Sequence, residues 1–209
     1  MPRHPRRSCA LVSGGVESAA LIDRLLARGD EVHPVYVRSG YRWEPAELRH
    51  LRRLLRAMRS PRLQPLAVLR APAKELAGAA HWGFSGRAVP GARSADASVY
   101  LPGRNLLLIS CAAVLCARRE IDAIALGTLR GNPFPDASPG FFSALAKTLA
   151  AGLKRRIRLE TPFRALTKAQ VMRGAAALPW ALTFSCISPR AGAPCERCNK
   201  CAERRRALR

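Results

Sequence analysis

The chain has 209 residues, and 48% of them are hydrophobic, so it is long and apolar enough to fold around one ordinary core. Its 36 basic and 14 acidic residues give a net charge of +22, which is typical of proteins that bind nucleic acid or another anion. The basic residues are 31 Arg and only 5 Lys, however, and GC-rich coding also produces an arginine excess. Nucleic-acid binding is therefore possible but not favoured.

The sequence argues against a membrane protein and a secreted one. The longest apolar segment, Leu106–Ala117, is shorter than the roughly 20 residues of a spanning helix. Near the N-terminus only Cys9–Val12 is apolar before a glycine pair, which is too short for a signal peptide. We therefore expect a cytoplasmic protein whose 7 cysteines are thiols or metal ligands rather than disulfides.

Short apolar segments alternate with helical periodicity in the first third of the chain. We predict strands and helices in the order strand Ser8–Ser13, helix Glu17–Arg28, strand Glu31–Val37, helix Glu44–Met58 and strand Leu66–Leu69. Pro34 has no amide hydrogen for a β-ladder, so we expect it at a sheet edge or a bulge. This alternation predicts an α/β fold, a parallel sheet with helices on both faces.

The periodicity disappears between Ala80 and Leu101, and we expect His81–Ser98 to be a mobile loop over a site. In this loop, His81 and Trp82 could stack on a base, although a loosely packed aromatic is the favoured interpretation. The predicted elements that follow are helix Arg104–Arg119, strand Asp122–Gly127, loop Thr128–Gly140, and helices Phe141–Gly152 and Thr167–Ala177. A Cys- and Arg-rich tail begins at Cys186, and its Arg204–Arg206 run is interpreted as a solvated helix end.

The segment Ser13–Ser18, with the sequence SGGVES, lies between a predicted strand and a predicted helix. Unpaired N–H groups and the dipole at a helix N-terminus attract an anion, and glycines let the backbone come close to it. No Lys follows, so this is not a GxxxxGK[ST] loop. We predict a phosphate-binding loop, in which a side chain at Gly14 should block phosphate without unfolding the domain. Glycine pairs also open many strand–helix turns that bind nothing.

Four cysteines near the C-terminus have the spacing C-x8-C-x2-C-x2-C, at Cys186, Cys195, Cys198 and Cys201. Such spacings let four thiolates reach one ion, and four thiolates match a closed, structural, tetrahedral Zn²⁺ site. An iron–sulfur cluster also takes four thiolates and stays open as an alternative. The other three cysteines, Cys9, Cys111 and Cys116, lie in apolar runs and are predicted to be core residues.

The loop resembles the SGGxDS signature of the ATP pyrophosphatases of the adenine-nucleotide α-hydrolase type, with Glu17 in place of Asp. Together with the cysteine spacing, it resembles the 7-cyano-7-deazaguanine synthase family. Further segments that resemble this family along nearly the whole chain are Leu101–Asn105, Ile121–Gly127, Pro135–Asp136 with Phe141–Phe142, Thr161–Pro162 and Leu166–Ala169.

The resemblance implies a Rossmann-like, ATP pyrophosphatase-type nucleotide-binding domain at residues 1–180 and a small zinc-binding tail at 181–209. It implies that ATP with Mg²⁺ contacts Val12, Ser13, Gly14, Gly15, Val16, Glu17, Ser18, Arg104, Asn105 and Gly127. It also implies catalytic roles for Ser13, Ser18 and Lys168. The plainer alternatives are a helix cap at Arg104–Asn105 and a solvated charge at Lys168.

Family members convert 7-carboxy-7-deazaguanine, ammonia and ATP to the 7-cyano base through an acyl-adenylate. The resemblance thus implies an ATP-dependent carbon–nitrogen ligase of queuosine biosynthesis, and a homodimer. Asp136 is expected to accept hydrogen bonds from the amine edge of the substrate, or else to cap the helix that follows it.

The segment Thr128–Phe134 differs from the family's substrate loop, Glu17 replaces the family's Asp, and the net charge is +22, so three further hypotheses stay open. These are a paralogue that adenylates a different acid, a tRNA-modifying ATP pyrophosphatase and a non-catalytic nucleotide-binding protein.

Overall fold

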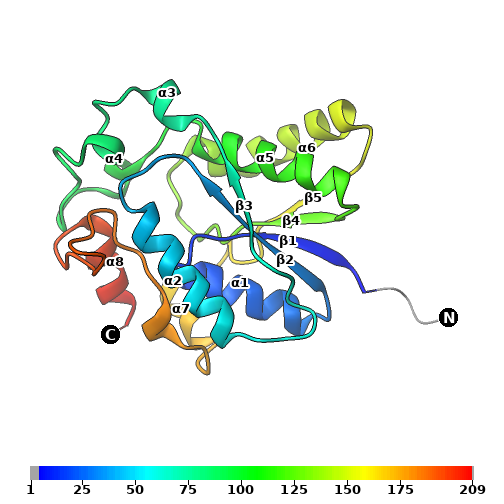
Figure 1. The fold of residues 1–209 in the computed structure, drawn as a ribbon, viewed down its shortest axis with the longest axis horizontal. Helices are drawn as coiled ribbons and strands as arrows, with labels where there is room; N and C mark the ends of the chain where they lie inside the picture. The colour runs from blue at the N-terminus through cyan, green and yellow to red at the C-terminus, as the bar shows by residue number, and fades with distance from the viewer. Residues whose placement is uncertain (1–4, 209) are drawn as a thin grey trace.

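The computed structural model describes residues 5–208 and contains a five-stranded sheet in the order β3-β2-β1-β4-β5 (Figure 1). All neighbouring strands are parallel, as predicted. The strands are β1 (Arg7–Leu11), β2 (Glu31–Arg38), β3 (Ala67–Arg70), β4 (Ala123–Ala125) and β5 (Arg158–Glu160). The last of these was not predicted, because three residues are too few for a periodic pattern.

Helices cover both faces of the sheet, which confirms the predicted architecture (Figure 1). The helices are α1 (Val16–Ala27), α2 (Glu44–Ala57), α3 (Ala73–Ala77), α4 (Trp82–Ser85), α5 (Arg104–Arg118), α6 (Pro139–Leu153), α7 (Lys168–Arg173) and α8 (Asn199–Ala207). Three short 3-10 helices are η1 (Asp96–Val99), η2 (Pro135–Ala137) and η3 (Trp180–Leu182). Across residues 5–208, every helix is too short or too polar to cross a membrane.

Two apolar clusters hold the helices to the sheet. One lies between the sheet and α5 and α6, where Cys9 and Cys116 are fully buried and Cys111 is partly buried, as predicted. The other lies between the sheet and α1 and α2. Burial of these apolar faces fixes the loops at the sheet's carboxyl edge relative to one another.

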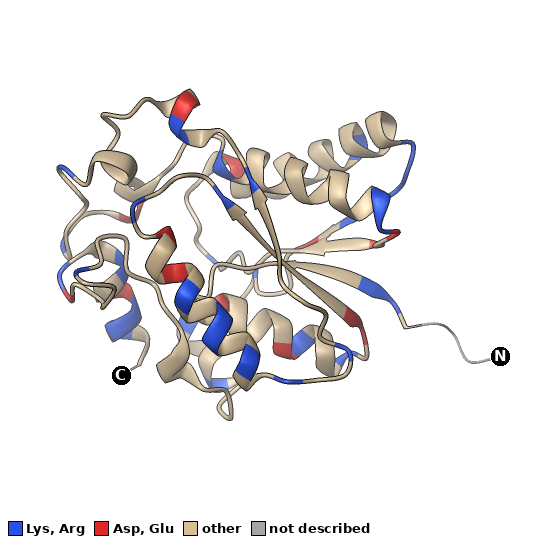
Figure 2. Cartoon of the chain, in the orientation of Figure 1, with Lys and Arg blue, Asp and Glu red and all other residues tan. Residues whose placement is uncertain are grey.

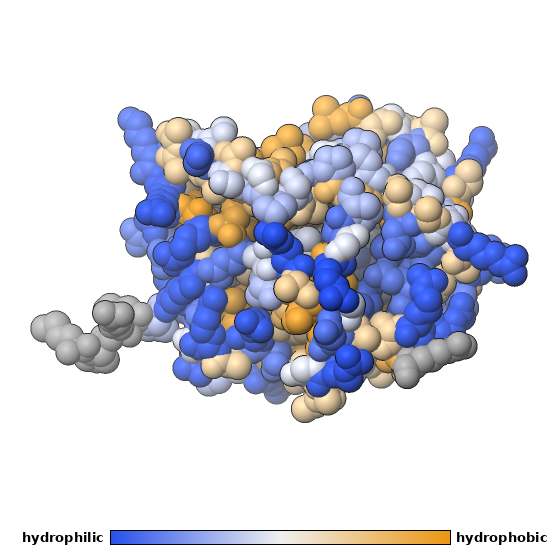
Figure 3. Space-filling model, turned by 180° about the vertical axis from the view of Figure 1, so that it is seen from behind, coloured by the Kyte–Doolittle hydropathy of each residue, from blue (hydrophilic) through white to orange (hydrophobic). Residues whose placement is uncertain are grey.

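Helix α2 has the predicted amphipathic pattern. Leu51 and Leu54 are buried, whereas Arg49, Arg52, Arg53 and Arg56 are exposed. Figure 2 shows this helix with acidic residues at its start and basic residues along the rest of its length. Much of the positive charge therefore lies on solvated surface, and the opposite side of the molecule is also largely hydrophilic, with hydrophobic residues in separate patches (Figure 3).

Of the two positions predicted for Pro34, the sheet edge is wrong, because β2 is an interior strand between β1 and β3. The bulge agrees with the structure. Pro34 is paired with Ala10 of β1. On the side of β2 that faces β3, the pairing changes from Val32–Leu63 to Val35–Ala67. The segment Leu63–Ala67 therefore has one residue more than the segment Val32–Val35 that it pairs with. This irregularity interrupts the ladder where proline has no N–H to donate.

The segment between Ala80 and Leu101 is more regular than predicted, because it contains α4 and η1. Its aromatic residues pack well: Trp82 stacks on Trp43 with ring centroids 5.7 Å apart, and Phe84 stacks on Tyr41 at 4.8 Å. The expectation of a loosely packed aromatic at Trp82 is therefore wrong.

Candidate nucleotide site and cysteine cluster

The candidate site lies at the carboxyl edge of the sheet, between β1 and β4. The chain passes from β1 outward to β2 and β3, and later from β4 outward to β5, so the two directions diverge at this point. Ligands of open parallel sheets bind in the crevice at such a switch point. Two adjoining cavities of about 320 and 220 Å³ occur here, and the larger lies within the usual size range of small-molecule sites.

The phosphate loop, Ser13–Ser18, connects β1 to α1 and lines both cavities. The Ser13 N–H donates to Ser18 Oγ at 2.9 Å, and the two hydroxyl oxygens are 3.4 Å apart. Val12 lines the smaller cavity, but Gly14 and Val16 line neither of the two, and the Val16 side chain is fully buried.

The two loop glycines have different surroundings. Gly14 has φ +83°, and a Cβ there would lie 3.1 Å from Leu51 Cβ on α2. Gly15 has φ −72°, and a Cβ there would lie 3.4 Å from Glu17 Oε2 and 3.5 Å from Ser13 Oγ. The expectation for Gly14 is therefore wrong: a side chain there would press on α2, and it is Gly15 that keeps the cavity open.

Glu17, in the phosphate loop, makes an ion pair with Lys168. The Lys168 Nζ lies 2.9 Å from Glu17 Oε1 and 2.7 Å from Glu203 Oε1. Burial lowers the pKa of Lys168, but the two carboxylates outweigh it and raise the pKa above its ordinary value. The alternative of a solvated lysine is excluded, because Lys168 is only 9% exposed.

Gly127 follows β4, lines both cavities and lies directly against Glu17 of the phosphate loop. A Cβ on Gly127 would lie 2.6 Å from Glu17 Cβ, closer than van der Waals contact permits. The absence of a side chain here lets the end of β4 approach the start of α1.

Asp136 caps α5 rather than α6. The Asn105 backbone N–H donates to Asp136 Oδ2 at 2.9 Å, and Asn105 Nδ2 donates to the Asp136 backbone oxygen at 3.0 Å. The helix that follows, α6, is capped instead by Ser138, whose Oγ accepts from Phe141 N at 3.2 Å. The alternative that Asp136 caps a helix is therefore correct, but the capped helix is α5, which precedes it, and not α6, which follows it. Asp136 and Asn105 both line the larger cavity.

Arg104 also lines both cavities. Its Nε atom is buried and has no hydrogen-bond partner among residues 5–208. Unpaired buried donors are uncommon in proteins, so this atom is available to an acceptor brought by a ligand. Arg104 and Asn105 therefore line the same cavities as the phosphate loop.

Glu47 on α2 was missed by the sequence analysis, although it lines both cavities. Its Oε2 accepts a 2.6 Å hydrogen bond from the Tyr36 hydroxyl. Burial raises the pKa of Glu47 to about 7, against the opposing effects of the Tyr36 hydrogen bond and the positive charge of Arg104. A carboxylate on the buried face of an arginine-rich helix was the feature that could have indicated it.

The four tail cysteines form one cluster, as predicted. Their sulfur atoms all lie within 4.8 Å of one another, and Cys186 Sγ is 3.9 Å from Cys198 Sγ. Tetrahedral zinc–sulfur bonds place sulfurs about 3.8 Å apart, so the arrangement fits a four-thiolate ion. The backbone N–H groups of Ser188 and Cys195 each donate to Cys186 Sγ at 3.3 Å, which stabilises negative charge on that sulfur.

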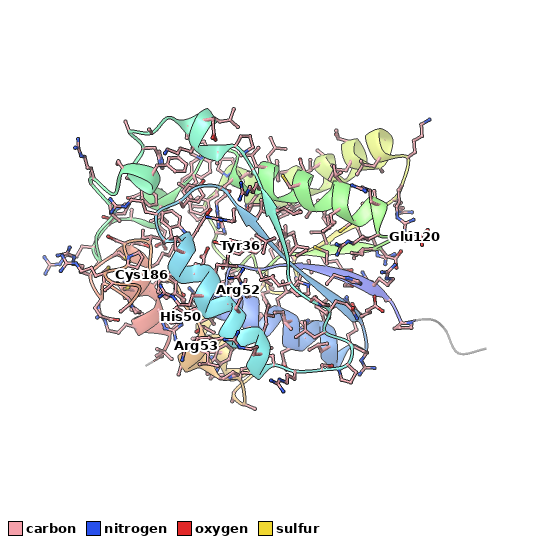
Figure 4. All side chains as sticks on the ribbon, viewed as in Figure 1. Tyr36, His50, Arg52, Arg53, Glu120 and Cys186 are labelled. Carbon is pink, nitrogen blue, oxygen red and sulfur yellow. The ribbon has the colours of Figure 1, made fainter. Side chains whose placement is uncertain are left out.

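The cysteine cluster packs directly beside the phosphate loop. The Phe184 N–H donates to Gly14 O at 2.8 Å, and its ring stacks on His50 of α2 at 4.8 Å. Figure 4 shows His50 on α2 and Cys186 in the C-terminal segment beside that helix. Farther along, Asn199 Nδ2 donates to Ser94 O at 2.8 Å. The C-terminal tail therefore packs against the phosphate loop, and its residues line the larger cavity together with residues that follow the sheet strands.

The expectation for Arg204–Arg206 is wrong at its first residue. Arg204 is partly buried, and its NH2 group donates to Trp180 O at 2.7 Å. Arg205 and Arg206 are exposed, as expected of a solvated helix end.

The parallel sheet, the strand–loop–helix connection at its switch point and the adjacent cysteine cluster define an α/β fold of the adenine-nucleotide α-hydrolase-like type. The fold resembles a 4-thiouridine synthetase crystallised with RNA and bound ATP, with a TM-score of 0.53 and 16% identity, over 97% of this chain and 50% of that one. It also resembles a predicted subunit of tRNA methyltransferase from Methanocaldococcus jannaschii, with a TM-score of 0.54 and 17% identity, over 82% of this chain and 74% of that one.

Within this class the chain belongs to the family described as "Queuosine biosynthesis protein QueC", whose model matches residues 7–209. The chain is 30% identical to 7-cyano-7-deazaguanine synthase 1 of Desulfitobacterium hafniense (strain Y51), over 95% of this chain and 89% of that protein. It is 31% identical to the 7-cyano-7-deazaguanine synthase of Anaeromyxobacter dehalogenans (strain 2CP-C), over 97% of this chain and 91% of that protein. The predicted family is thus confirmed, and it is a family of enzymes.

Proposed function

We propose that this protein is an ATP-dependent carbon–nitrogen ligase that converts 7-carboxy-7-deazaguanine and ammonia to 7-cyano-7-deazaguanine. The observation that carries the proposal is the phosphate loop at the switch point, with Lys168 buried 2.9 Å from Glu17, in a chain of this family. The loop, the lysine and the remaining cavity provide room for both a triphosphate and a flat acid.

A carboxylate is a poor acyl donor because oxide is a poor leaving group. In the proposed reaction a carboxylate oxygen attacks the α-phosphorus of ATP, and the bond to pyrophosphate breaks. Ammonia then attacks the acyl carbon, and AMP leaves to give the amide. The amide oxygen attacks the α-phosphorus of a second ATP, and pyrophosphate leaves. Loss of two protons and AMP from this adenylated amide then gives the nitrile. Positioning and charge stabilisation are the protein's main contributions to these steps.

The residues have separate roles in this proposal. Ser13, Ser18 and the backbone at Gly15 hold the departing pyrophosphate, and Lys168 compensates its charge. Arg104 and Asn105, which line the larger cavity, would donate to the α-phosphate of the transferred adenylyl group. Asp136 lines the same cavity and still has lone pairs for an amine edge.

Two ions accompany the reaction in this proposal. Mg²⁺ enters with ATP, and Glu17 is the carboxylate of the phosphate loop that suits it as a ligand. Zn²⁺ in the cysteine cluster is structural, because four thiolates leave no open coordination position.

The altered segment Thr128–Phe134 favours one alternative, a paralogue that adenylates a different acid. Leu129, Arg130 and Asn132 from this segment line the larger cavity, so they would contact whatever lies beside the nucleotide. The same adenylation chemistry would then serve another carboxylate.

The test is to incubate the zinc-loaded protein with ATP, Mg²⁺, ammonium and 7-carboxy-7-deazaguanine. We expect AMP, pyrophosphate and, by mass spectrometry, the nitrile, with two AMP for each nitrile formed. Parallel reactions contain other purine-like acids or tRNA in place of this acid. ADP and orthophosphate as products would refute the pyrophosphatase assignment. AMP release only with another acid, or only with tRNA, would refute the proposed substrate.

A further inference from the structure

A row of four alternating charges links the phosphate loop to α8, the helix that carries the last cysteine of the cluster. Glu17 Oε1 lies 2.9 Å from Lys168 Nζ, which lies 2.7 Å from Glu203 Oε1. The second Glu203 oxygen, Oε2, lies 2.7 Å from Lys200 Nζ. All four residues line the larger cavity. The phosphate loop, α7 and α8 therefore contribute side chains to one ionic network.

Within residues 5–208, the two lysines keep hydrogen-bond donors free for another acceptor. An ammonium group has three N–H donors and cannot accept. Lys168 places two of them on Glu17 and Glu203, and Lys200 places one on Glu203. The remaining donors belong to groups that line the cavity, where an oxygen-rich anion can accept from them.

The backbone of Lys200 is fixed from both sides. Lys200 lies between the cluster residues Cys198 and Cys201, at the start of α8. Its neighbour Asn199 is 1% exposed, donates its N–H to Pro90 O at 3.0 Å and donates its side chain to Ser94 O at 2.8 Å. Because a flexible lysine loses rotamer entropy when it is held, a fixed backbone and the Glu203 ion pair reduce the further loss on binding an anion.

We propose that Lys200 is a second phosphate-binding lysine and that Glu203 is the positioning residue that holds Lys168 and Lys200 toward the phosphate loop. The ligand class is the pyrophosphate end of a nucleoside triphosphate. Helix α8, which carries the cluster residue Cys201, is then part of the nucleotide site rather than only part of a metal-binding tail. This inference rests on the proposed function, because it assigns residues to the same ATP site.

The first test removes the charge of Lys200. In Lys200→Met and Lys200→Gln, the affinity for pyrophosphate and ATP, measured by calorimetry on zinc-loaded protein, should fall about tenfold, which is about 1.4 kcal/mol. The affinity for adenosine should stay within about twofold, because adenosine carries no phosphate. Lys200→Arg, which keeps the charge, should bind pyrophosphate within about threefold of the unchanged protein. Arg205→Met is the matched control, since Arg205 lies on the same helix and pairs with Glu196 instead.

In the second test, the direction of the change in pyrophosphate affinity in Glu203→Gln separates a positioning role of Glu203 from a simple effect of its charge. If Glu203 only adds a negative charge beside the phosphates, Glu203→Gln should tighten pyrophosphate binding. If Glu203 positions the two lysines, the same change should weaken it by about threefold to tenfold. The effect of Lys200→Met should also shrink in the Glu203→Gln background, because the two residues act through one contact. Metal content is measured on every preparation.

Pyrophosphate affinity that stays unchanged in Lys200→Met and Lys200→Gln would overturn the role of Lys200. Tighter binding in Glu203→Gln would overturn the positioning role. A loss of pyrophosphate affinity that tracks a loss of zinc in every Lys200 and Glu203 variant would also overturn the inference, in favour of a purely structural role. Failure of the unchanged protein to bind ATP or pyrophosphate would instead refute the proposed function itself, so the two failures are distinguishable.

Discussion

Substitution of the two loop glycines separates the folding role of the phosphate loop from its ligand-binding role. Gly15→Ala should preserve the fold, because φ −72° suits alanine and the new Cβ meets its nearest neighbours at 3.4–3.7 Å. That methyl group would lie beside Glu17 and Ser13, in the space that the phosphate needs. We expect the affinity for pyrophosphate to fall at least tenfold, by about 1.4 kcal/mol or more.

Gly14→Ala should have the opposite effects. Its φ of +83° is strained for alanine, and the Cβ would lie 3.1 Å from Leu51 Cβ. Backbone strain and the close contact together should cost about 2 kcal/mol of folding free energy. In a chain of this size, that loss lowers the melting temperature by about 4–8 °C. Pyrophosphate affinity of the folded fraction should change less than in Gly15→Ala.

The assay combines thermal unfolding with calorimetric titration of pyrophosphate into both variants and the unchanged protein. Gly29→Ala is a control for positive-φ strain, since its φ is +92° and the space around it is open. The reasoning would be refuted if Gly15→Ala bound pyrophosphate normally. It would also be refuted if Gly14→Ala were as stable as the unchanged protein but had lost its affinity for pyrophosphate.

Four further predictions concern the metal, the carboxylates and pH. Metal analysis should find about one zinc per chain, and Ser in place of any cluster cysteine should reduce it and destabilise the tail; iron–sulfur colour would contradict this. Because the pKa of Glu47 is raised to about 7, its contribution to stability is full below pH 4.5 and is lost as pH rises through 7. Glu47→Gln should therefore stabilise the fold at pH 8 by about 3 kcal/mol and flatten the pH dependence between pH 5 and 8 in denaturant titrations, and an unchanged pH profile would refute this. Glu17→Asp should leave AMP release within about tenfold, a barrier change near 1.4 kcal/mol, if Glu17 only adjusts the loop; a larger loss would show that the Lys168 contact needs the longer side chain. Asp136→Asn should raise the Michaelis constant for the acid while calorimetry shows unchanged ATP affinity, and weakened ATP binding would instead indicate that α5 has shifted.

Local patterns predicted the fold because they carry its physical cause. The apolar runs around Cys9 and Val35 are buried strands, and the spacing of Leu51 and Leu54 places one face of α2 on the sheet. The phosphate loop and the cysteine cluster were found because each needs its residues at fixed, short separations along the chain. Such features depend on few long-range contacts, so they can be recognised without a structure.

The features that were missed depend on which distant segments meet. Asp136 caps a helix that precedes it in sequence. The sequence left an edge and a bulge open for Pro34, and the choice between them depends on the register of β2 against the chain near Leu63. The role of Glu47 follows from burial between Tyr36 and Arg104, and no local pattern determines that burial. These interactions depend on how distant elements pack together, and no regular spacing of residues in the sequence indicates that packing.

The distribution of acidic residues bears on how a strongly basic chain could select ATP. Of its 14 Asp and Glu residues, a sizeable group lines the two adjoining cavities, namely Glu17, Glu44, Glu47, Asp96, Asp136 and Glu203. The exposed arginines of α2 lie outside these cavities. The cavity is therefore much less positive than the surface, and general attraction would draw polyanions to the surface rather than into the site. In the proposed function, selection of ATP would depend on directed donors from the loop backbone, Lys168, Lys200 and Arg104. The surrounding carboxylates would favour a phosphate that arrives with a divalent cation over bare phosphate.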